Sequence, residues 1–442
     1  SRTGDVLMST VAKKVIMGSG AVAEFGIDQS AILDNAGNAH LKRTPGTAGN
    51  RRTFTLSCWI KKTAVTANAS IFTQGLHVTF DPALLQVSYY TAAGGHLIRL
   101  GTTAVFRDIA AWYHIVLAFD TTQGTATDRV KIYINGVRQT SFVSGQQTFP
   151  SQNLETSVNN TADVFYLGSL NATANSIGYL AETHFIDGTA KAASDFGETN
   201  SATGQWIPKE YTGGSYGTNG FYLKFASGAI GTDSSGEGND LTAVNLANSD
   251  VVTDTPNNNF CTLNSVDGGA TFSEGNLKAT TAGSDGRRIL ATIGVESGKW
   301  YWEFKPLVNV ANGIALGVTL TSDVTSGNLG ASAAPAWGWY SQNTNDGYSV
   351  TSSSYAAIGP YMNADDVIGA ALDLDNSTIT FYKNGSAANV AITIPSSGLF
   401  MPVFGDGDNS AGSAFEVNFG QKTFAHTPPS GFSALSTANL PD

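Results

Sequence analysis

The chain has 442 residues, of which only 13% are charged while 49 are glycine, and its formal net charge is −11. This composition is short of the residues that cover helix surfaces and rich in those that occupy turns, so it predicts an all-β protein. Hydrophobic residues at 41% and aromatic residues at 10% are enough for packed cores and exclude a disordered chain. At about 150 residues per domain, the length predicts two or three domains.

The charge pattern and the apolar pattern each exclude a class of partner. No basic run is longer than two residues, and phosphate recognition needs a concentrated cationic surface, so we expect no nucleic-acid binding. The longest apolar stretches, such as residues 367–372, fall far short of the roughly 18 residues of a membrane span, so we expect no membrane insertion. Cys58 and Cys261 are too few for a disulfide framework or a cysteine-based zinc site.

Residues 1–20 are interpreted as an N-terminal arm, and strand patterns begin soon after it. Residues 54–60, Phe-Thr-Leu-Ser-Cys-Trp-Ile, alternate apolar and polar side chains with the period of two that is typical of a strand with one buried face. Similar short segments recur at residues 71–72, 85–90, 96–100, 113–119 and 130–134. Short strands separated by Gly, Asn and Asp predict a β-sandwich over residues 21–190.

Two hairpins in distant parts of the chain share one pattern. Asn135-Gly136 follows an alternating strand, and Asn-Gly favours the positive φ angles of a type I′ turn. Asn384-Gly385 follows another alternating strand, and each hairpin is preceded by an apolar strand that ends in Asp, at residues 115–120 and 367–373. The repetition predicts two related sandwiches, the second over residues 261–442.

Residues 191–260 form a Gly- and Asn-rich connector between the two predicted sandwiches. It contains Trp206-Ile-Pro and Phe221-Tyr-Leu-Lys-Phe225, which are too apolar and aromatic to stay in solvent. We therefore expect the connector to pack against a domain.

The first region resembles a laminin G-like jelly roll of the concanavalin A type. The resemblance rests on Trp59, Trp112-Tyr-His-Ile-Val116, the Asn135-Gly136 hairpin, Phe165-Tyr-Leu-Gly168 and Tyr179-Leu-Ala-Glu182, in that order. The last strand lacks the acidic pair that many such domains carry. The calcium sites known in part of that family are therefore not transferred to this chain.

The last region resembles a SPRY domain, a second sandwich of the same jelly-roll type. The motifs that carry this resemblance are Gly298-Lys-Trp-Tyr-Trp-Glu-Phe304, Trp337-Gly-Trp339, the strand at 366–375 and Val417-Asn-Phe-Gly420. The expected fold class is therefore all-β, with two concanavalin A-like jelly-roll sandwiches joined by the connector.

The combination of these domains with the connector motifs Trp206-Ile-Pro-Lys209 and Asp254-Thr-Pro-Asn-Asn-Asn-Phe260 resembles bacteriophage virion proteins of tail or head fibres. The resemblance implies a location on the surface of the phage particle. It also implies other virion proteins as partners and a homo-oligomer, since symmetric assembly is the usual state.

The residue types that catalysis needs do not cluster in the sequence. A retaining glycoside hydrolase of this fold class needs two close carboxylates, for example as Glu-x-Asp-x-x-Glu, whereas Glu155, Glu182, Glu303 and Glu416 are scattered. The six histidines stand alone, and His114 lies inside an expected core strand. We therefore predict no catalytic residues and no enzymatic activity.

Two acidic turns are candidates for calcium, the one cofactor that the sequence leaves open. Asp406-Gly-Asp408-Asn409 and Asp373-Leu-Asp375-Asn376 place oxygen atoms at alternate positions, as calcium loops do. Neither has the EF-hand pattern, and Asp and Asn also favour tight turns in which they bond their own backbone. Turn chemistry is the favoured interpretation, and no metal site is predicted.

The segment from Trp337 to Tyr355 is the candidate binding loop. Sugars need aromatic faces for their apolar side and amide or carboxylate groups for their hydroxyls. The candidate ligand-binding residues are Trp337, Tyr340, Asn343, Asp346, Tyr348 and Tyr355. The alternative is that Trp337 and Trp339 fill the sandwich core.

Taken together, these features favour a non-enzymatic phage fibre or spike component that recognises the host surface through a cell-surface glycan. One alternative is a structural capsid decoration or adaptor protein that does not contact the host. A polysaccharide depolymerase is the least favoured alternative, because the catalytic residue sets are missing.

Overall fold

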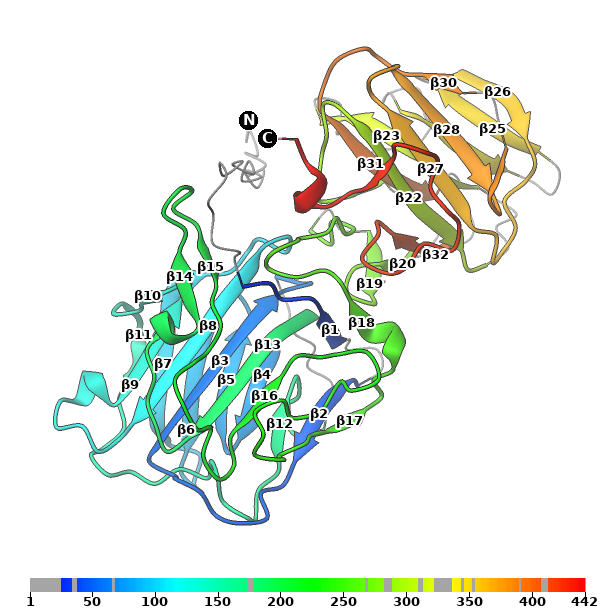
Figure 1. The fold of residues 1–442 in the computed structure, drawn as a ribbon. Coiled ribbons are helices and arrows are strands. Elements are labelled where there is room, and N and C mark those ends of the chain that lie inside the picture. The colour runs from blue at the N-terminus through cyan, green and yellow to red at the C-terminus, as the bar shows by residue number, and fades with distance from the viewer. Residues whose placement is uncertain are drawn as a thin grey trace. The chain divides into compact units, whose positions relative to one another are not determined.

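The structure is a computed structural model of the 442-residue chain (Figure 1). It describes residues 25–33, 38–65, 68–172, 178–266, 269–281, 288–308, 313–321, 336–342, 346–351, 354–388, 391–406 and 412–441. These residues fall into two compact units, the first within Met17–Asn257 and the second within Asn258–Asp442. None of the helices in the described residues is long and apolar enough to cross a membrane.

The predicted all-β class is confirmed, since the described regular structure consists of strands and of short 3-10 turns. The 3-10 turns are η1 (Ala126–Asp128), η2 (Ala193–Asp195), η3 (Asn248–Asp250) and η5 (Thr437–Asn439).

The first unit is a sandwich of two eight-stranded sheets. One sheet, called the β3 sheet, has the order β10-β9-β8-β3-β13-β1-β18, with β16 also paired to β13. Its strands are β1 (Ser30–Leu33), β3 (Thr53–Lys61), β8 (Trp112–Asp120), β9 (Val130–Ile134), β10 (Val137–Arg138), β13 (Gly178–Asp187), β16 (Phe221–Leu223) and β18 (Val251–Val252).

The other sheet of the first unit, called the β6 sheet, has the order β11-β7-β6-β5-β4-β12-β2-β17. Its strands are β2 (His40–Arg43), β4 (Ala69–Gln74), β5 (Leu76–Asp81), β6 (Leu84–Tyr90), β7 (His96–Val105), β11 (Phe142–Thr148), β12 (Phe165–Leu167) and β17 (Thr242–Val244). The strand β5 is not among the strands predicted from the sequence.

The core of the first unit lies between these two sheets. Alternation along β3 sends Phe54, Leu56, Cys58 and Ile60 into it, as the period of two predicts. Phe54 stacks on Phe119 of β8 with ring centroids 4.5 Å apart. Cys58 is buried and free, and burial raises the pKa of its thiol.

The outward face of the β3 sheet is also buried, because the chain after residue 190 returns over it (Figure 1). Every residue of β13 is buried, which requires cover on both faces. The covering residues include Phe196, Tyr211 and Tyr216, and they pack on Val116 of β8 and Ile186 of β13. The segment also forms a two-stranded ribbon from β14 (Gly197–Thr199) and β15 (Trp206–Pro208) and adds β16, β17 and β18 to the two sheets. We call residues 191–257 the covering segment.

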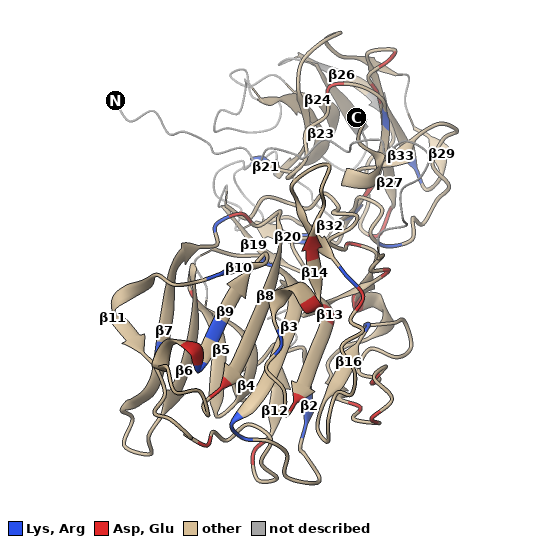
Figure 2. Ribbon diagram, turned by 60° about the vertical axis from the view of Figure 1, so that its left-hand side comes forward, with Lys and Arg blue, Asp and Glu red and all other residues tan. Residues whose placement is uncertain are grey.

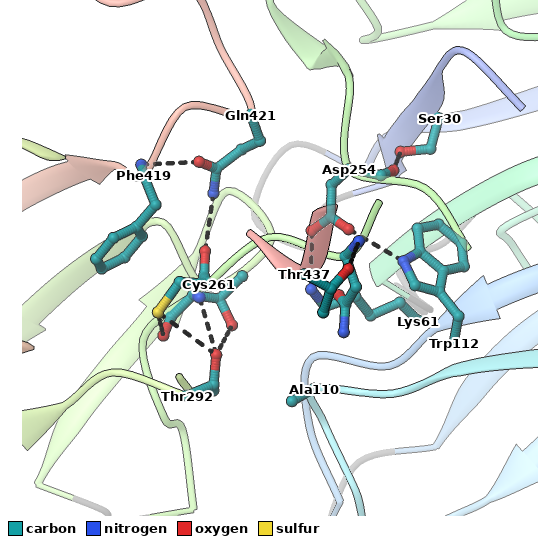
Figure 3. Close-up of polar contacts among 12 residues, drawn as sticks. Ser30, Lys61, Ala110, Trp112, Asp254, Cys261, Thr292, Phe419, Gln421 and Thr437 are labelled. Atoms are coloured by element: carbon teal, nitrogen blue, oxygen red, sulfur yellow. Dashed lines mark hydrogen bonds and ion pairs between the residues drawn. The ribbon is translucent and has the colours of Figure 1, made fainter. Parts of the chain in front are cut away.

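A buried ion pair holds the end of the covering segment on the β3 sheet. The Nζ atom of Lys61 lies 2.8 Å from Oδ2 of Asp254, and both side chains are almost fully excluded from solvent. The indole N–H of Trp112 donates to Oδ1 of the same carboxylate at 3.0 Å, and the hydroxyl of Ser30 donates to the Asp254 carbonyl (Figure 3). Side chains of three strands thus converge on one residue of the covering segment.

The second unit is a sandwich of a nine-stranded sheet, the β22 sheet, and a six-stranded sheet, the β24 sheet. The β22 sheet contains β19 (Ala270–Ser273), β20 (Lys278–Thr281), β22 (Lys299–Pro306), β27 (Ile368–Asp373), β28 (Thr378–Lys383), β29 (Ser386–Ala387), β30 (Ile392–Thr393), β32 (Ala414–Asn418) and β33 (Ser433–Ala434). The β24 sheet contains β21 (Arg288–Leu290), β23 (Ile314–Leu320), β24 (Trp337–Gln342), β25 (Asp346–Thr351), β26 (Ser354–Gly359) and β31 (Phe400–Asp406). Between the sheets, Phe304 stacks on Phe404 with centroids 5.8 Å apart.

The beginning of the second unit is tied to its last strands. The side-chain amide of Gln421 donates to the carbonyl of Cys261, and its carbonyl oxygen accepts the backbone N–H of Phe419 (Figure 3). The backbone N–H of Cys261 donates to Leu435, and Thr292 donates to the Cys261 sulfur. Cys261 is therefore buried in a hydrogen-bonded position, and Cys58 and Cys261 form no disulfide.

The two predicted hairpins use the same hydrogen bonds. In the first, the backbone N–H of Asn135 donates to the carbonyl of His114, and the Asn135 side chain accepts the backbone N–H of His114. In the second, Asn384 forms the same two bonds with Val367. Both asparagines have positive φ, as a type I′ turn requires.

The buried ion pair gives a test of how the covering segment is held. Replacing Asp254 with Ala leaves the Lys61 ammonium and the Trp112 N–H buried without the carboxylate. We expect a loss of about 3–5 kcal/mol in the unfolding free energy of the first unit. The measurement is denaturant unfolding of the full chain, analysed as separate transitions of the two units.

Two variants serve as controls for this loss. Replacing Lys131, whose ion pair with Asp128 is exposed, with Ala should cost less than about 1 kcal/mol. The double variant Lys61→Met with Asp254→Leu should recover most of the stability, because it removes both charges. An Asp254→Ala loss no larger than the Lys131→Ala loss would contradict the role of the pair.

Candidate functional site

The strands β24, β25 and β26 bring several predicted binding residues onto one face of the β24 sheet. In the antiparallel register, Tyr340 lies directly opposite Tyr348, and Val350 lies opposite Tyr355. Because side chains alternate between the two faces of a strand, Tyr348 and Val350 occupy the same side of β25. The register therefore places Tyr340 and Tyr348 on the outward face of the sheet, whereas the side chains of Asp346 and Tyr355 lie outside the described part of the chain.

Trp337 has a different position from the other candidates. It lies on the inward face of β24, is 6% exposed, and packs edge-on against Phe400. Trp339 is also inward and contacts Phe381 of the β22 sheet with centroids 5.9 Å apart. Both tryptophans fill the sandwich core, so the Trp337 ring has no open face for a ligand. Asn343 lies outside the described residues.

Small, buried residues lie beside Tyr340 on β23 and β24, and we call them the floor. Ala315 lies opposite Tyr340, and Gly317 lies opposite Gly338 in the next row of the sheet. A Cβ on Gly317 or Gly338 would lie within 2.3 Å of the backbone of the facing strand, so the close approach of β23 and β24 requires glycine at both positions. We call Tyr340, Tyr348, Ala315, Gly317 and Gly338 the tyrosine face.

Burial differs between the two tyrosines of this face. Tyr340 is 4% exposed and packs in a cluster with Ala315, Val350 and Val403, whereas Tyr348 is half-buried and packs against that cluster. Tyr348 is therefore the aromatic side chain of the described face that a ligand can reach.

The sequence of β23 contains a signal for the floor of small residues. Residues 314–320, Ile-Ala-Leu-Gly-Val-Thr-Leu, alternate large apolar residues with small or polar ones, which indicates a strand with a crowded inward face and a flat outward face. Gly338, between two tryptophans, continues that flat surface on the next strand.

The calcium candidates give no metal centre in the described residues. Asp406 is the last residue of β31, and Asp408 lies outside the described part. Burial raises the pKa of the Asp373 carboxyl, but hydrogen bonds from Lys299 and Asn376 outweigh it and hold the pKa below its usual value. The described part of the chain holds no group of three or more His, Cys, Asp or Glu that could bind a metal ion.

The buried glutamates are held by fixed donors. The Glu303 carboxylate accepts the backbone N–H groups of Ala425 and His426, both at 2.8 Å. Glu182 lies at a bulge of β13 with a φ of 45° and accepts the hydroxyl of Tyr222 at 2.6 Å. Each carboxylate binds a neighbouring segment to a sheet.

His114 forms a Ser–His contact that is oriented against base catalysis. The indole N–H of Trp206 can only donate, and it donates to Nδ1 of His114 at 3.0 Å. The ring proton is therefore assigned to Nε2, which donates to the hydroxyl of Ser57 at 2.9 Å. A general base would need to accept from that hydroxyl. Burial, and secondarily the nearby His184, lower the pKa of His114 to about 3.

Comparison with known families identifies both domain types. The sequence profile of the concanavalin A-like lectin/glucanases superfamily matches residues 35–193, and the SPRY domain profile matches residues 299–422. The chain thus carries an N-terminal laminin G/concanavalin A-like domain and a C-terminal SPRY domain, and the predicted fold class of two jelly-roll sandwiches is confirmed. Both domain types point to binding roles.

Curated relatives match about a third of the chain. Ran-binding protein 9 of Danio rerio is 29% identical and Ran-binding protein 10 of the same organism is 30% identical, each over 163 residues. Each match covers 35% of this chain and 26% of the relative, so the chain matches about a quarter of the length of these relatives.

Solved structures of SPRY domains also match about a third of the chain. The PSpry domain of TRIM65 is 17% identical with a TM-score of 0.30, covering 36% of this chain and 91% of that one. The SPRY domain of human HERC1 is 18% identical with a TM-score of 0.30, covering 35% and 96%.

The state of His114 gives a prediction for the pH dependence of stability. Its pKa is about 3 in the folded domain and about 6.5 in an unfolded chain, so below pH 6.5 the unfolded state binds more protons. Stability therefore falls as the pH falls, by about 2 kcal/mol from this group between pH 7 and pH 5. Urea unfolding at both pH values should show a smaller difference for His114→Gln.

The exposed His96 provides the matched control for this measurement. His96→Gln should keep the full difference between pH 7 and pH 5. If His114→Gln kept it as well, the assigned neutral state of His114 would be wrong.

Proposed function

We propose that this chain is a non-enzymatic recognition protein of a bacteriophage particle that binds a host-surface glycan through its SPRY domain. The observation that carries the proposal is the tyrosine face, where Tyr340 and Tyr348 form a cross-strand pair next to a floor of small residues. The pairing with a lectin-type sandwich in the same chain supports it.

The chemistry of the tyrosine face suits a sugar ring. An aromatic side chain offers an apolar surface to the C–H face of a pyranose, and its hydroxyl can bond the sugar hydroxyls. Ala315, Gly317 and Gly338 are themselves buried, so a sugar would contact this face through the half-buried Tyr348.

The non-enzymatic part of the proposal rests on the engaged state of the titratable groups. His114 presents a proton to Ser57 instead of accepting one, and Glu182 and Glu303 are bound by Tyr222 and by backbone N–H groups. A glycoside hydrolase needs one carboxyl group that gives a proton and a second that attacks or activates water. These two glutamates lie in different units and serve as structural acceptors.

The phage location and the partners follow from the domain order and the connector motifs of the sequence. In this proposal the chain lies on the surface of the virion, assembles as a homo-oligomer with other virion proteins, and contacts the host glycan. It has no nucleic-acid partner and does not insert into the membrane.

A second candidate function is that of an adaptor whose SPRY domain binds a protein segment. The observation that favours it is the match of about a third of the chain to relatives that are named Ran-binding proteins. In that case the tyrosine face would contact an apolar side chain of another virion protein, and the host would not be touched.

The test replaces the accessible aromatic side chain of the face. Tyr348→Ala should weaken binding to the recognised glycan about tenfold, or ~1.4 kcal/mol, because it removes the stacking surface. The measurement is binding of the full chain to an array of bacterial surface polysaccharides, followed by titration with the recognised one. Tyr382→Ala is the matched control, since Tyr382 is also half-buried but lies on the other sheet.

The proposal is wrong if the intact chain binds no bacterial polysaccharide, or if both tyrosine variants weaken binding equally. Capture of a purified virion protein by the intact chain but not by Tyr348→Ala, without any glycan binding, would establish the adaptor function instead.

A further inference from the structure

The strand β26 (Ser354–Gly359) is the outer edge of the β24 sheet in the SPRY domain. The sheet order ends in β24-β25-β26, and among the described strands β26 pairs with β25 alone. The described backbone–backbone hydrogen bonds outside the sheet ladders do not involve it either. An edge strand presents a row of N–H and C=O groups to its open side, and these groups can pair with a strand of another chain.

The sequence of β26 lacks the features by which proteins protect an open edge. It reads Ser-Tyr-Ala-Ala-Ile-Gly and contains no charged residue and no proline. Its pairing with β25 is regular from Ser354 to Ala357, and its register shift lies beyond Ala357, near the end of the strand. Ala356 and Ala357 are exposed and small, so these side chains leave the backbone edge accessible. The strand is therefore suited to edge-to-edge pairing.

The other ends of the four sandwich sheets are shorter or interrupted. The strands β10, β17, β18, β19, β21 and β29 have two to four residues each, and β10 and β21 also carry Arg138 and Arg288. The strand β11 has seven residues, but its pairing with β7 is broken between Phe142 and Gln147. Among the described sheet ends, β26 is therefore the one that best fits a strand of another chain.

The charge of the chain favours a second copy as the partner of this edge. Each chain carries a net charge of −11, which makes copies repel one another, and charged residues are scattered over the ribbon (Figure 2). Pairing of β26 with the β26 of another copy brings no charged side chain of either strand into the contact. It also covers two equivalent open edges at once.

We propose that two copies of this chain form a dimer by antiparallel pairing of β26 with β26 about a two-fold axis perpendicular to the β24 sheet. The two β24 sheets then continue into each other through the contact. Because both copies use the same strand, the contact is isologous and the assembly closes at two chains. The inference deepens the proposed function, since it names the contact of the homo-oligomer, and it rests on that function in this respect alone.

The dimer places the two tyrosine faces on the same side of the joined sheet. A two-fold axis perpendicular to a sheet keeps the outward face of each copy outward. The two β25 strands, which carry Tyr348, are then separated by three strand spacings, or about 14 Å across the strands. A polymeric ligand that contacts one tyrosine face can thereby contact the other without leaving the dimer, which raises its overall affinity.

The experiment measures the mass of the full chain in solution by sedimentation, without any glycan, over about a hundredfold range of concentration. We expect an equilibrium between monomer and dimer that depends on concentration, because an interface built on one pair of strands is small. Failure of glycan binding would appear in the Tyr348→Ala titration and leaves this measurement unchanged. The failure of the proposed function and that of the dimer are therefore distinguishable.

The first variant puts like charges into the contact. Ala356→Lys places one lysine of each copy close to the two-fold axis, directly opposite or diagonal to the other, which is within reach of long side chains. We expect this variant to weaken dimerisation at least about tenfold, because like charges that meet in an interface are strongly unfavourable. Its melting temperature should stay unchanged at concentrations where the intact chain is monomeric, since Ala356 is exposed.

A second variant tests whether the two copies meet directly at this strand. Ala356→Glu should also weaken dimerisation of its own chain at least about tenfold, for the same reason. An equimolar mixture of the lysine and glutamate variants should recover the dimer, with one chain of each kind, because opposite charges now face each other. A loss of dimer that came from damage to the fold would not be recovered by mixing.

The matched control is Ala243→Lys in the edge strand β17 of the first unit. Ala243 is an exposed alanine opposite the buried Leu41, as Ala356 is opposite the buried Ser349, and this variant should dimerise as the intact chain does. The inference is overturned by an intact chain that stays monomeric, by equal losses in Ala243→Lys and Ala356→Lys, or by a mixture that stays monomeric. A dimer that survives Ala356→Lys but is lost on deletion of residues 1–20 would also overturn it and assign the contact to the N-terminal arm.

Discussion

The ion pair between Lys61 and Asp254 is the constraint on which the packing of the covering segment against the β3 sheet depends. Lys61 points away from the sandwich core, where a lysine would ordinarily reach water, but it is almost fully buried because Asp254 lies against it. An unpaired charge in that place would be strongly unfavourable, so the covering segment must return to the β3 sheet. That return excludes water from the sheet surface around Trp59 and His114, which is why the histidine stays neutral and serves as a hydrogen-bond bridge.

In both domains, a ring from a later segment of the chain packs on the glycine of the Asn-Gly hairpin. Each Asn-Gly hairpin is fixed by two bonds between its asparagine and the strand before it. The glycine then lies under a ring from a later segment, Trp206 over Gly136 in one domain and His426 next to Gly385 in the other. A side chain on either glycine would occupy the position of that ring. The turn residue is therefore selected both by its φ angle and by the segment that packs on it.

The tyrosine face of the SPRY domain depends on the close approach of two strands. The strands β23 and β24 lie too close together for side chains at Gly317 and Gly338, and both glycines are buried. Tyr340 is buried beside them, whereas Tyr348 on the next strand is only half-buried. The exposure of a tyrosine on this face is therefore set by its place in the sheet and not by its residue type.

The sequence by itself determined the all-β class, the two sandwiches and the Asn-Gly hairpins, because period-two alternation and turn residues are local signals. It missed β5, whose short alternation at residues 76–81 directly follows another strand. It also placed Trp337 among the ligand-binding residues, whereas the structure places that ring in the core. Which residues share a face depends on strand register, and the register joins residues far apart in the chain. Lys61 and Asp254 are 193 positions apart, and the local sequence around either residue does not indicate that the two form an ion pair. Only the tertiary structure decided that pairing and the tyrosine face, because long-range contacts are set by packing and not by local sequence.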